Sequence, residues 1–303
     1  MMDKYLISIV GPTAIGKTAL SIKLAKHFNT EIISADSRQF FKEMQIGTAA
    51  PMPSELRAAK HHFIHHKSIT EQYSVGTFEK DAIEKLTQLF NSHDVVIMVG
   101  GSGLYVDAVT KGLDYFPDIS PEIRINLNKQ LEEKGLEYLQ KQLKELDLTS
   151  YNSIEISNPH RVIRALEICL GTDKPYSSFL NKEKGKRNFK TITIGLTADR
   201  EIIYERINKR VDIMIQEGLL EEVKSLLKYQ DLNALNTVGY KEFFNFLNTN
   251  WSLEFAISEI KKNTRRFAKR QLTWFKKNED CLWVDYNSNI DSILQAINSK
   301  INH

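Results

Sequence analysis

Cysteine is scarce in this chain of 303 residues, which has only Cys169 and Cys281. Each lies in an apolar run without a CxxC partner, so the pattern indicates buried, reduced thiols rather than a metal or redox site. No run approaches the roughly 18 apolar residues that span a bilayer. The apolar run Tyr5–Val10 is too short for the apolar core of a signal peptide. We therefore expect a cytoplasmic protein without a membrane partner.

A strong charge of either sign is also missing. The formal net charge is +3, with 42% apolar and 26% charged residues, which is typical of globular proteins. This modest excess neither requires nor excludes a nucleic-acid partner, so the distribution of basic residues must decide.

Short apolar strands alternate with helices in the first hundred residues. Tyr5–Val10, Glu31–Ser34 and Val95–Val99 have the character of buried parallel strands. Thr18–Phe28 and Phe78–Phe90 have apolar residues at helical spacing. The alternation predicts an α/β fold with a parallel sheet and a functional site at the strand ends.

The middle of the chain is polar and helical. Leu127, Leu131, Leu139 and Leu143 supply an apolar helical face, and Asn158–Leu170 forms a further helix. Lys190–Leu196 then alternates as a strand, and Leu282–Asp285 is a late one. We therefore expect residues 117–188 to form an inserted helical region, with 1–116 and 189–303 forming the core and a helical C-terminal part.

A glycine-rich segment joins the first expected strand to the first expected helix. Residues 11–18, GPTAIGKT, match GxxxxGK[ST] in the context that this pattern requires. Its backbone N–H groups and the helix N-terminus favour phosphate, and the Thr18 hydroxyl would ligate Mg²⁺. The segment predicts binding of a di- or triphosphate, as in nucleotide-binding and ATP-binding proteins. The residues expected to bind are Gly11, Pro12, Thr13, Ala14, Ile15, Gly16, Lys17 and Thr18.

A carboxylate, Asp36, follows the second expected strand. It fits a general base or an outer ligand of a metal, and it fits a helix cap or Asx turn equally well. Spacing alone leaves both interpretations open.

Seven sequence blocks carry a resemblance to one family. They are GPTAIGKT (11–18), ISADSRQFFKEMQIGTAAP (33–51), YSVGTFEKDA (73–82), VGGSGLYVDAVTKGL (99–113), NPHRVIRALEI (158–168), VGYKEF (238–243) and TRRFAKRQLTWF (264–275). In this order they resemble the tRNA dimethylallyltransferases, the IPP transferase family. The resemblance covers nearly the whole chain and implies a P-loop NTPase-like parallel sheet core.

The resemblance also implies a reaction. Members of the family transfer a dimethylallyl group from dimethylallyl diphosphate to N6 of the adenosine 3′-adjacent to the anticodon of tRNA. The loop 11–18 with Mg²⁺ would hold the diphosphate. Asp36 would be the general base, and Lys17, Ser102 and Arg210 would complete the catalytic set. We expect a monomer.

The resemblance assigns tRNA contacts to several segments. A solvated helix face is the alternative for the basic residues near the C-terminus. The expected contacts are Asp36, Ser37, Arg38, Gln39, Ser102, Arg124, His160, Arg161, Val162, Ile163, Arg164, Val238, Gly239, Tyr240, Arg265, Arg266, Lys269 and Arg270.

Other features have two interpretations. On a helix, the histidines between His61 and His66 would form i, i+4 pairs that could bind a metal, but a polar or RNA-facing loop is favoured. Phe267 is expected on the apolar side of the basic helix, and Trp251 and Trp274 are expected in the core.

The sequence departs from the family in places. Ser102 replaces a threonine but keeps the hydroxyl. Ile15 replaces a small polar residue, and Ala50 stands where a lysine often follows GTA.

Two other functions compete with tRNA prenylation. One is an adenylate isopentenyltransferase or P-loop kinase acting on a free nucleotide. The other is an ATP-dependent RNA-binding protein without transfer activity.

Overall fold

The computed structural model describes residues 3–180 and 185–302 and divides the chain into two compact units. Unit 1 is Met1–Lys111 with Arg187–His303, and unit 2 is Gly112–Lys186. An inserted helical region was expected at 117–188; the structure places unit 2 at 112–186. Each unit has its own apolar core.

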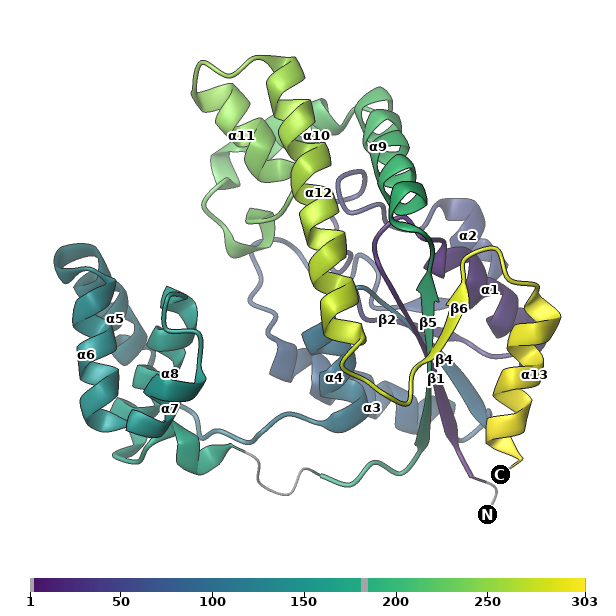
Figure 1. Ribbon diagram of the computed structural model, residues 1–303, viewed down its shortest axis with the longest axis horizontal. Helices are drawn as coiled ribbons and strands as arrows, with labels where there is room; N and C mark the ends of the chain where they lie inside the picture. Colours follow the sequence, from purple (N-terminus) through teal and green to yellow (C-terminus); the bar gives the residue numbers. More distant parts are fainter. Residues whose placement is uncertain (1–2, 181–184, 303) are drawn as a thin grey trace. The chain divides into compact units, whose positions relative to one another are not determined.

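Unit 1 is built on a parallel sheet (Figure 1). Within the described residues the strand order is β3-β2-β4-β1-β5-β6. The strands are β1 (Tyr5–Val10), β2 (Ile32–Ser34), β3 (His61–His62), β4 (Val95–Val99), β5 (Lys190–Thr197) and β6 (Leu282–Asp285). The predicted α/β fold is therefore confirmed, and β3 is a short strand that the sequence pattern did not separate from a loop.

The central strand β1 is buried on both sides, as its unbroken apolar run predicts. Tyr5, Ile7 and Ile9 pack in one core, together with residues of α1 (Lys17–His27) and α13 (Ile290–Ile301). Leu6 and Val10 face the opposite core, which contains residues of α3 (Val75–Leu89) and α4 (Gly103–Lys111). Helices thus cover both faces of the sheet.

A third core holds the C-terminal helices of unit 1. Tyr240, Phe243 and Ile260 are almost fully buried in it. Its helices are α9 (Arg200–Gln216), α10 (Leu219–Ser225), α11 (Tyr240–Asn248) and α12 (Leu253–Phe275), and the short α2 (Pro53–Ala58) lies earlier in the chain.

Unit 2 is helical, as expected. Leu127, Leu139 and Leu143 are fully buried in its core, whereas Leu131 is partly buried. Its helices are α5 (Pro121–Lys134), α6 (Leu136–Leu146), α7 (Leu148–Ser153) and α8 (Pro159–Thr172).

Candidate functional site

The loop 11–18 turns from β1 into α1 with unusual backbone angles. Gly11, Ala14 and Gly16 have φ values of 141°, 64° and 109°, a region that favours glycine. A Cβ on Gly11 would lie 2.6 Å from the carbonyl oxygen of Leu196, so no larger residue fits there. The Ile15 side chain is 1% exposed in the core. Only the backbone of Ile15 can therefore face a ligand.

Lys17 is bound by its own loop. Its Nζ donates to the carbonyl oxygens of Gly11, at 3.0 Å, and Pro12, at 2.7 Å. Burial lowers the pKa of Lys17 to about 8, with smaller effects from Asp36, which raises it, and Arg210, which lowers it. Burial also lowers the pKa of Arg210, on α9. Arg210 and Asp36 therefore lie close enough to Lys17 to affect its charge.

Two further residues hold the loop, and the sequence patterns did not identify them. Gln271 of α12 is 5% exposed. It accepts from the backbone N of Thr13 at 2.8 Å and donates to the carbonyl oxygen of Gly101 at 2.9 Å. Arg206 of α9 donates to the carbonyl oxygen of Ala14 at 2.8 Å. Gln271 lies within the block TRRFAKRQLTWF, but only its burial and its two partners reveal its position at the loop.

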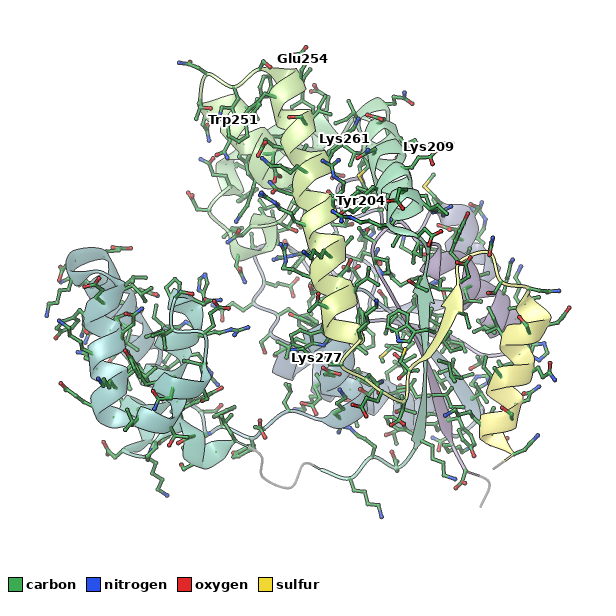
Figure 2. The ribbon with its side chains drawn as sticks, viewed as in Figure 1. Tyr204, Lys209, Trp251, Glu254, Lys261 and Lys277 are labelled. Atoms are coloured by element: carbon green, nitrogen blue, oxygen red, sulfur yellow. The ribbon has the colours of Figure 1, made fainter. Side chains whose placement is uncertain are left out.

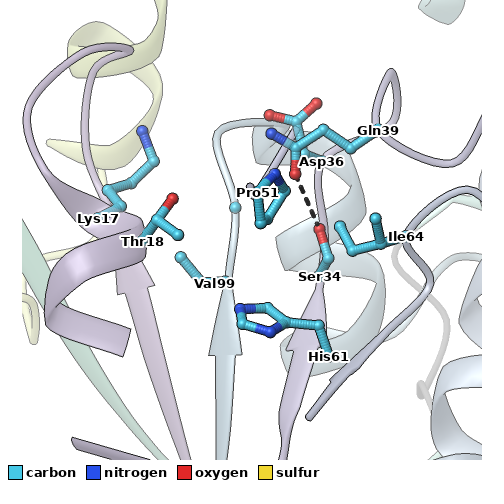
Figure 3. Close-up of a pocket in the computed structure, with 10 residues that line it drawn as sticks. Lys17, Thr18, Ser34, Asp36, Gln39, Pro51, His61, Ile64 and Val99 are labelled. Carbon is cyan, nitrogen blue, oxygen red and sulfur yellow. Dashed lines mark hydrogen bonds between the residues drawn. The ribbon is translucent and has the colours of Figure 1, made fainter. Parts of the chain in front are cut away.

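Asp36 follows β2 and forms the Asx turn that is one of its two sequence interpretations, whereas its role as a general base stays a prediction. Its Oδ1 accepts from the backbone N of Arg38 at 3.1 Å, which is an Asx turn. The residue also lines a cavity with Lys17 and Thr18 (Figure 3). The carboxylate therefore shapes its own turn and remains beside the loop 11–18.

The same cavity has an apolar side. Pro51, Ile64 and Val99 line it together with the polar residues (Figure 3). The site therefore combines charge for an anion with apolar surface for a hydrocarbon group.

The neighbours of Asp36 are held by hydrogen bonds. Ser102 Oγ lies 3.1 Å from the backbone N and 3.0 Å from Oγ of Ser37. The Nε2 of Gln39 donates to the carbonyl oxygens of Thr48 and Ala49, at 3.3 and 3.2 Å. These bonds fix the segment after β2 in place.

Arg38 is engaged within unit 1. Its guanidinium donates to the carbonyl oxygens of Asn233, Ala234 and Asn236 at 2.8–3.3 Å, and burial lowers its pKa. The Arg38 side chain therefore has a structural role in unit 1, and its expected tRNA contact stays a prediction.

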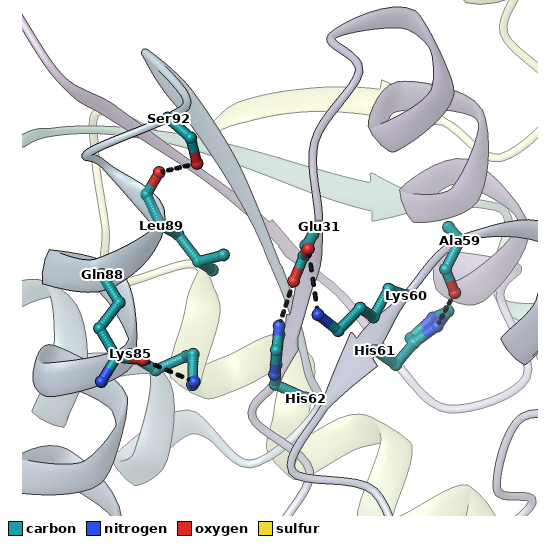
Figure 4. Close-up of polar contacts among 9 residues, drawn as sticks. All are labelled: Glu31, Ala59, Lys60, His61, His62, Lys85, Gln88, Leu89 and Ser92. Atoms are coloured by element: carbon teal, nitrogen blue, oxygen red, sulfur yellow. Dashed lines mark hydrogen bonds and ion pairs between the residues drawn. The ribbon is translucent and has the colours of Figure 1, made fainter.

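The histidine segment is no helix, so the i, i+4 metal pairs are wrong. His61 and His62 form β3, and His62 Nε2 lies 2.5 Å from Oε2 of Glu31 (Figure 4). Burial lowers the pKa of His66 to about 4. In residues 3–180 and 185–302, no group of three or more His, Cys, Asp or Glu side chains is arranged to hold a metal.

The basic helix α12 has a different exposed face from the one expected. Figure 2 shows Lys261 on this helix and Lys277 just after its end. Phe267 and Trp274 are 37% and 36% exposed, so the prediction that they lie on the apolar side is wrong. Arg265 is partly buried; its NH1 donates to Oδ1 of Asn208 at 2.8 Å. The exposed basic residues of its central part are Arg266, Lys269 and Arg270.

Tyr240 is fully buried, so its side chain cannot contact RNA as expected. Its hydroxyl donates to Oε1 of Glu222 at 2.6 Å. The carboxylate of Glu222 also accepts from the backbone N atoms of residues 45–47 at 2.8–3.0 Å. Val238 and Gly239 precede α11, where Gly239 N donates to Glu242 at 2.8 Å. Glu222, which accepts from Tyr240, thus fixes the loop 45–47.

The expected RNA contacts in unit 2 are of two kinds, buried and exposed. The Val162 and Ile163 side chains are buried in its core, so their expected contact with RNA is wrong. Arg124 and Arg164 are 46% and 40% exposed at their side chains. His160 and Arg161 are exposed at the start of α8.

The remaining sequence predictions concern cysteines and membranes. Cys169 and Cys281 are buried free thiols, as expected. Trp251 was expected in the core; it is half-buried and packs against the third core of unit 1. Among the helices of the described part of the chain, none is long and apolar enough to cross a membrane.

Known proteins are similar to this chain in sequence. The family model described as IPP transferase matches residues 39–278. The tRNA dimethylallyltransferase of Christiangramia forsetii is 64% identical over 301 residues, which are 99% of this chain and 100% of that protein. That of Flavobacterium psychrophilum is 60% identical over 305 residues, 99% of each chain.

Solved structures of tRNA-modifying transferases are similar to this chain in fold. The full-length tRNA isopentenylpyrophosphate transferase of Bacillus halodurans has a TM-score of 0.72 and 37% identity, covering 99% of this chain and 96% of its own. A eukaryotic dimethylallyltransferase acting on tRNA has a TM-score of 0.83 and 27% identity, covering 98% and 79%. With a family model matched over most of its length and relatives this similar from end to end, the chain belongs to the IPP transferase family.

Proposed function

We propose that this chain transfers a dimethylallyl group from dimethylallyl diphosphate to N6 of the adenosine 3′-adjacent to the anticodon of tRNA. One observation carries the proposal: Lys17, Thr18 and Asp36 line one cavity, which also has apolar walls. Cations suit a departing diphosphate, and a carboxylate suits an amine that loses a proton. We also propose that the chain acts as a monomer in the cytoplasm, as expected from the sequence.

The proposed step is a displacement at carbon. The N6 nitrogen forms a bond to C1 of the dimethylallyl group as the bond from C1 to the diphosphate oxygen breaks. The diphosphate keeps the electron pair and is stabilised by Lys17, Arg210 and the loop amides. The proton of N6 passes to the carboxylate of Asp36. The loop thus holds the leaving group, whereas in a kinase it would hold the group that moves.

Magnesium fits this site through Thr18. Thr18 follows Lys17 in the chain and lines the same cavity as Asp36. Mg²⁺ commonly takes one or two protein ligands together with phosphate oxygens and water. When bound, Mg²⁺ would neutralise charge on the leaving diphosphate.

The test compares acceptors. Dimethylallyl diphosphate labelled in its carbon chain is incubated with unmodified tRNA, with AMP or with ATP. Label in tRNA alone supports the proposal, and label in AMP or ATP indicates the adenylate enzyme instead. Label in none of them contradicts transfer and favours an RNA-binding protein without this activity.

Asp36→Asn tests the base. The amide keeps an oxygen that can accept from Arg38 N, so the turn is retained while the proton acceptor is lost. We expect kcat to fall about 10²–10⁴-fold with unchanged tRNA affinity. Normal turnover of this variant would remove Asp36 from the mechanism.

A further inference from the structure

Unit 2 contains a buried carboxylate between two arginines. Glu167 of α8 is 5% exposed. Its Oε2 accepts from NH1 of Arg164, one turn earlier on the same helix, at 2.8 Å. It also accepts from NH1 of Arg124, on α5, at 3.2 Å. A buried carboxylate is costly unless it is paired, so this arrangement needs both partners.

The two arginines face outward although their partner is buried. Their side chains are 46% exposed in Arg124 and 40% exposed in Arg164, against 7% in Glu167. The cluster has one more positive charge than the carboxylate neutralises. Each guanidinium has five N–H donors, and the described bonds to Glu167 use one nitrogen of each. Donors therefore remain for an anionic or planar ligand.

An aromatic pair fixes Arg164 further. Its guanidinium carbon lies 5.2 Å from the ring centre of Phe116. The ring of Phe116 stacks on Tyr176, with centroids 5.1 Å apart and planes within 7°. Arg164 is thus held by a carboxylate and by a ring, both within unit 2. A surface arginine without such partners samples many rotamers, and ordering it on binding costs free energy.

We infer that Glu167 is a positioning residue, which presents Arg124 and Arg164 to the phosphates and unpaired bases of the RNA substrate. Arginine binds phosphate through a planar fork and stacks on unstacked bases, and both interactions need a defined guanidinium plane. The inference rests on the proposed function, because it assigns the cluster to the same RNA.

If Glu167 acted only through its charge, replacing it would strengthen RNA binding instead of weakening it. Glu167 is negative, so replacing it with neutral glutamine makes unit 2 more positive and strengthens non-specific attraction to RNA. If Glu167 instead positions the arginines, the same substitution loosens them and weakens binding despite the added positive charge. The direction of the change therefore separates the two roles.

The experiment measures the dissociation constant of the full chain for an unmodified anticodon stem-loop RNA at fixed salt. We expect Glu167→Gln to weaken binding about tenfold, comparable to the loss of one charge-assisted hydrogen bond. The matched control is Glu137→Gln, which removes the same charge from an exposed position on α6 of unit 2. Binding by Glu167→Gln as tight as by Glu137→Gln would overturn the inference.

Two further measurements separate positioning from folding. Arg164→Lys keeps the charge and leaves Glu167 with a cationic partner but removes the planar fork; we expect a similar loss of affinity with a normal melting temperature. In a chain with both Arg124→Ala and Arg164→Ala, adding Glu167→Gln should cause no further loss of affinity. A further loss there would show that Glu167 acts through the fold, which overturns positioning.

Failure of the inference and failure of the proposed function remain distinct. The transfer assay with labelled donor tests the function in the unaltered chain. The comparison of the two glutamine variants tests Glu167 by RNA affinity alone. Normal transfer with equal affinities would overturn only the role of Glu167, and absent transfer would overturn the function whatever the affinities.

Discussion

The side-chain amine of Lys17 changes its protonation state within the pH range in which the protein can be studied. Its pKa is lowered to about 8 by burial, so the fraction that carries charge falls as pH rises through 8. An anion binds the charged form, and each pH unit above 8 should therefore weaken diphosphate binding by up to about tenfold. Below pH 7 the lysine contributes fully and its effect no longer changes with pH.

The measurement is the affinity for inorganic diphosphate between pH 7 and 9.5. Lys17→Met supplies the control, since the ionisation of the ligand affects both proteins equally. The ratio of the two affinities should fall above pH 8. Lys17→Arg stays charged over this range. The ratio of its diphosphate affinity to that of Lys17→Met should therefore be the same at every pH. A constant ratio in the unaltered protein would contradict the low pKa.

Gln271 leads to a prediction about two loops at once. Gln271→Leu leaves Thr13 N and the Gly101 carbonyl oxygen without this partner, which should cost about 1–3 kcal/mol of folding free energy. We expect kcat/KM for the prenyl donor to fall about tenfold, because Gly101 adjoins Ser102, while RNA affinity stays unchanged. Thr273→Val, on the exposed side of α12, is the control, and equal kinetics for both variants would contradict a positioning role.

Individual residues were predictable where they belong to a local pattern. The loop 11–18 and Asp36 each follow an apolar strand, so their place at the edge of a parallel sheet follows from chain order. Gln271 and Arg206 reach the loop from helices far along the chain, and a tertiary contact of that kind leaves no local pattern.

At the scale of the element, α12 has two faces with separate roles. Ala268 and Gln271 are buried, and Arg266, Lys269 and Arg270 are exposed. Replacing these three by glutamine should make the dependence of log Kd on log salt less steep by about 2, because each single-strand phosphate contact contributes about 0.7.

Arg265→Gln is the matched comparison on the same helix. Its guanidinium lies 5.7 Å from the ring centre of Tyr204 and bonds Asn208, so this variant should leave the salt slope nearly unchanged and lower the melting temperature. If the triple variant has the same slope of log Kd against log salt as the unaltered chain, the basic residues of α12 form only a solvated helix face.

Most strands of the sheet and the first helices were predictable from periodicity, because buried strands and amphipathic helices follow simple spacing rules, whereas the helices after β5 were expected only as one helical region. The exposed face of α12 was not predictable. Phe267 and Trp274 are apolar residues that lie on the solvent side, and Tyr240 is a polar-edged residue that lies in a core with its hydroxyl on Glu222. Polarity alone therefore places such residues on the wrong side.

For the whole molecule, the division into two units predicts separable stabilities. Asp147 is 3% exposed in unit 2 and accepts four hydrogen bonds of 2.6–3.0 Å from Ser150 and Ser177. Asp147→Ala should therefore destabilise unit 2 by about 3 kcal/mol. Unit 1 should keep its affinity for inorganic diphosphate while RNA affinity falls.

Calorimetry of the full chain together with diphosphate titration checks this. The control is Glu133→Ala, an exposed residue of α5 in the same unit. Loss of diphosphate binding in step with the unfolding of unit 2 would contradict independent units. The helical insertion itself was foreseeable from the change in composition, but its limits were not, since they depend on where contacts between the two cores end.

The arrangement of β1 has a consequence for synthesis on the ribosome. Strand β1 pairs on one side with β4 and on the other with β5, where Ile9 lies opposite Ile194. A nascent chain therefore makes all of unit 2 before β5 emerges to complete the sheet. Gly11 packs against Leu196, and Arg206 and Gln271 emerge later still. The loop 11–18 is thus translated before these partners and is among the last segments to reach its finished shape.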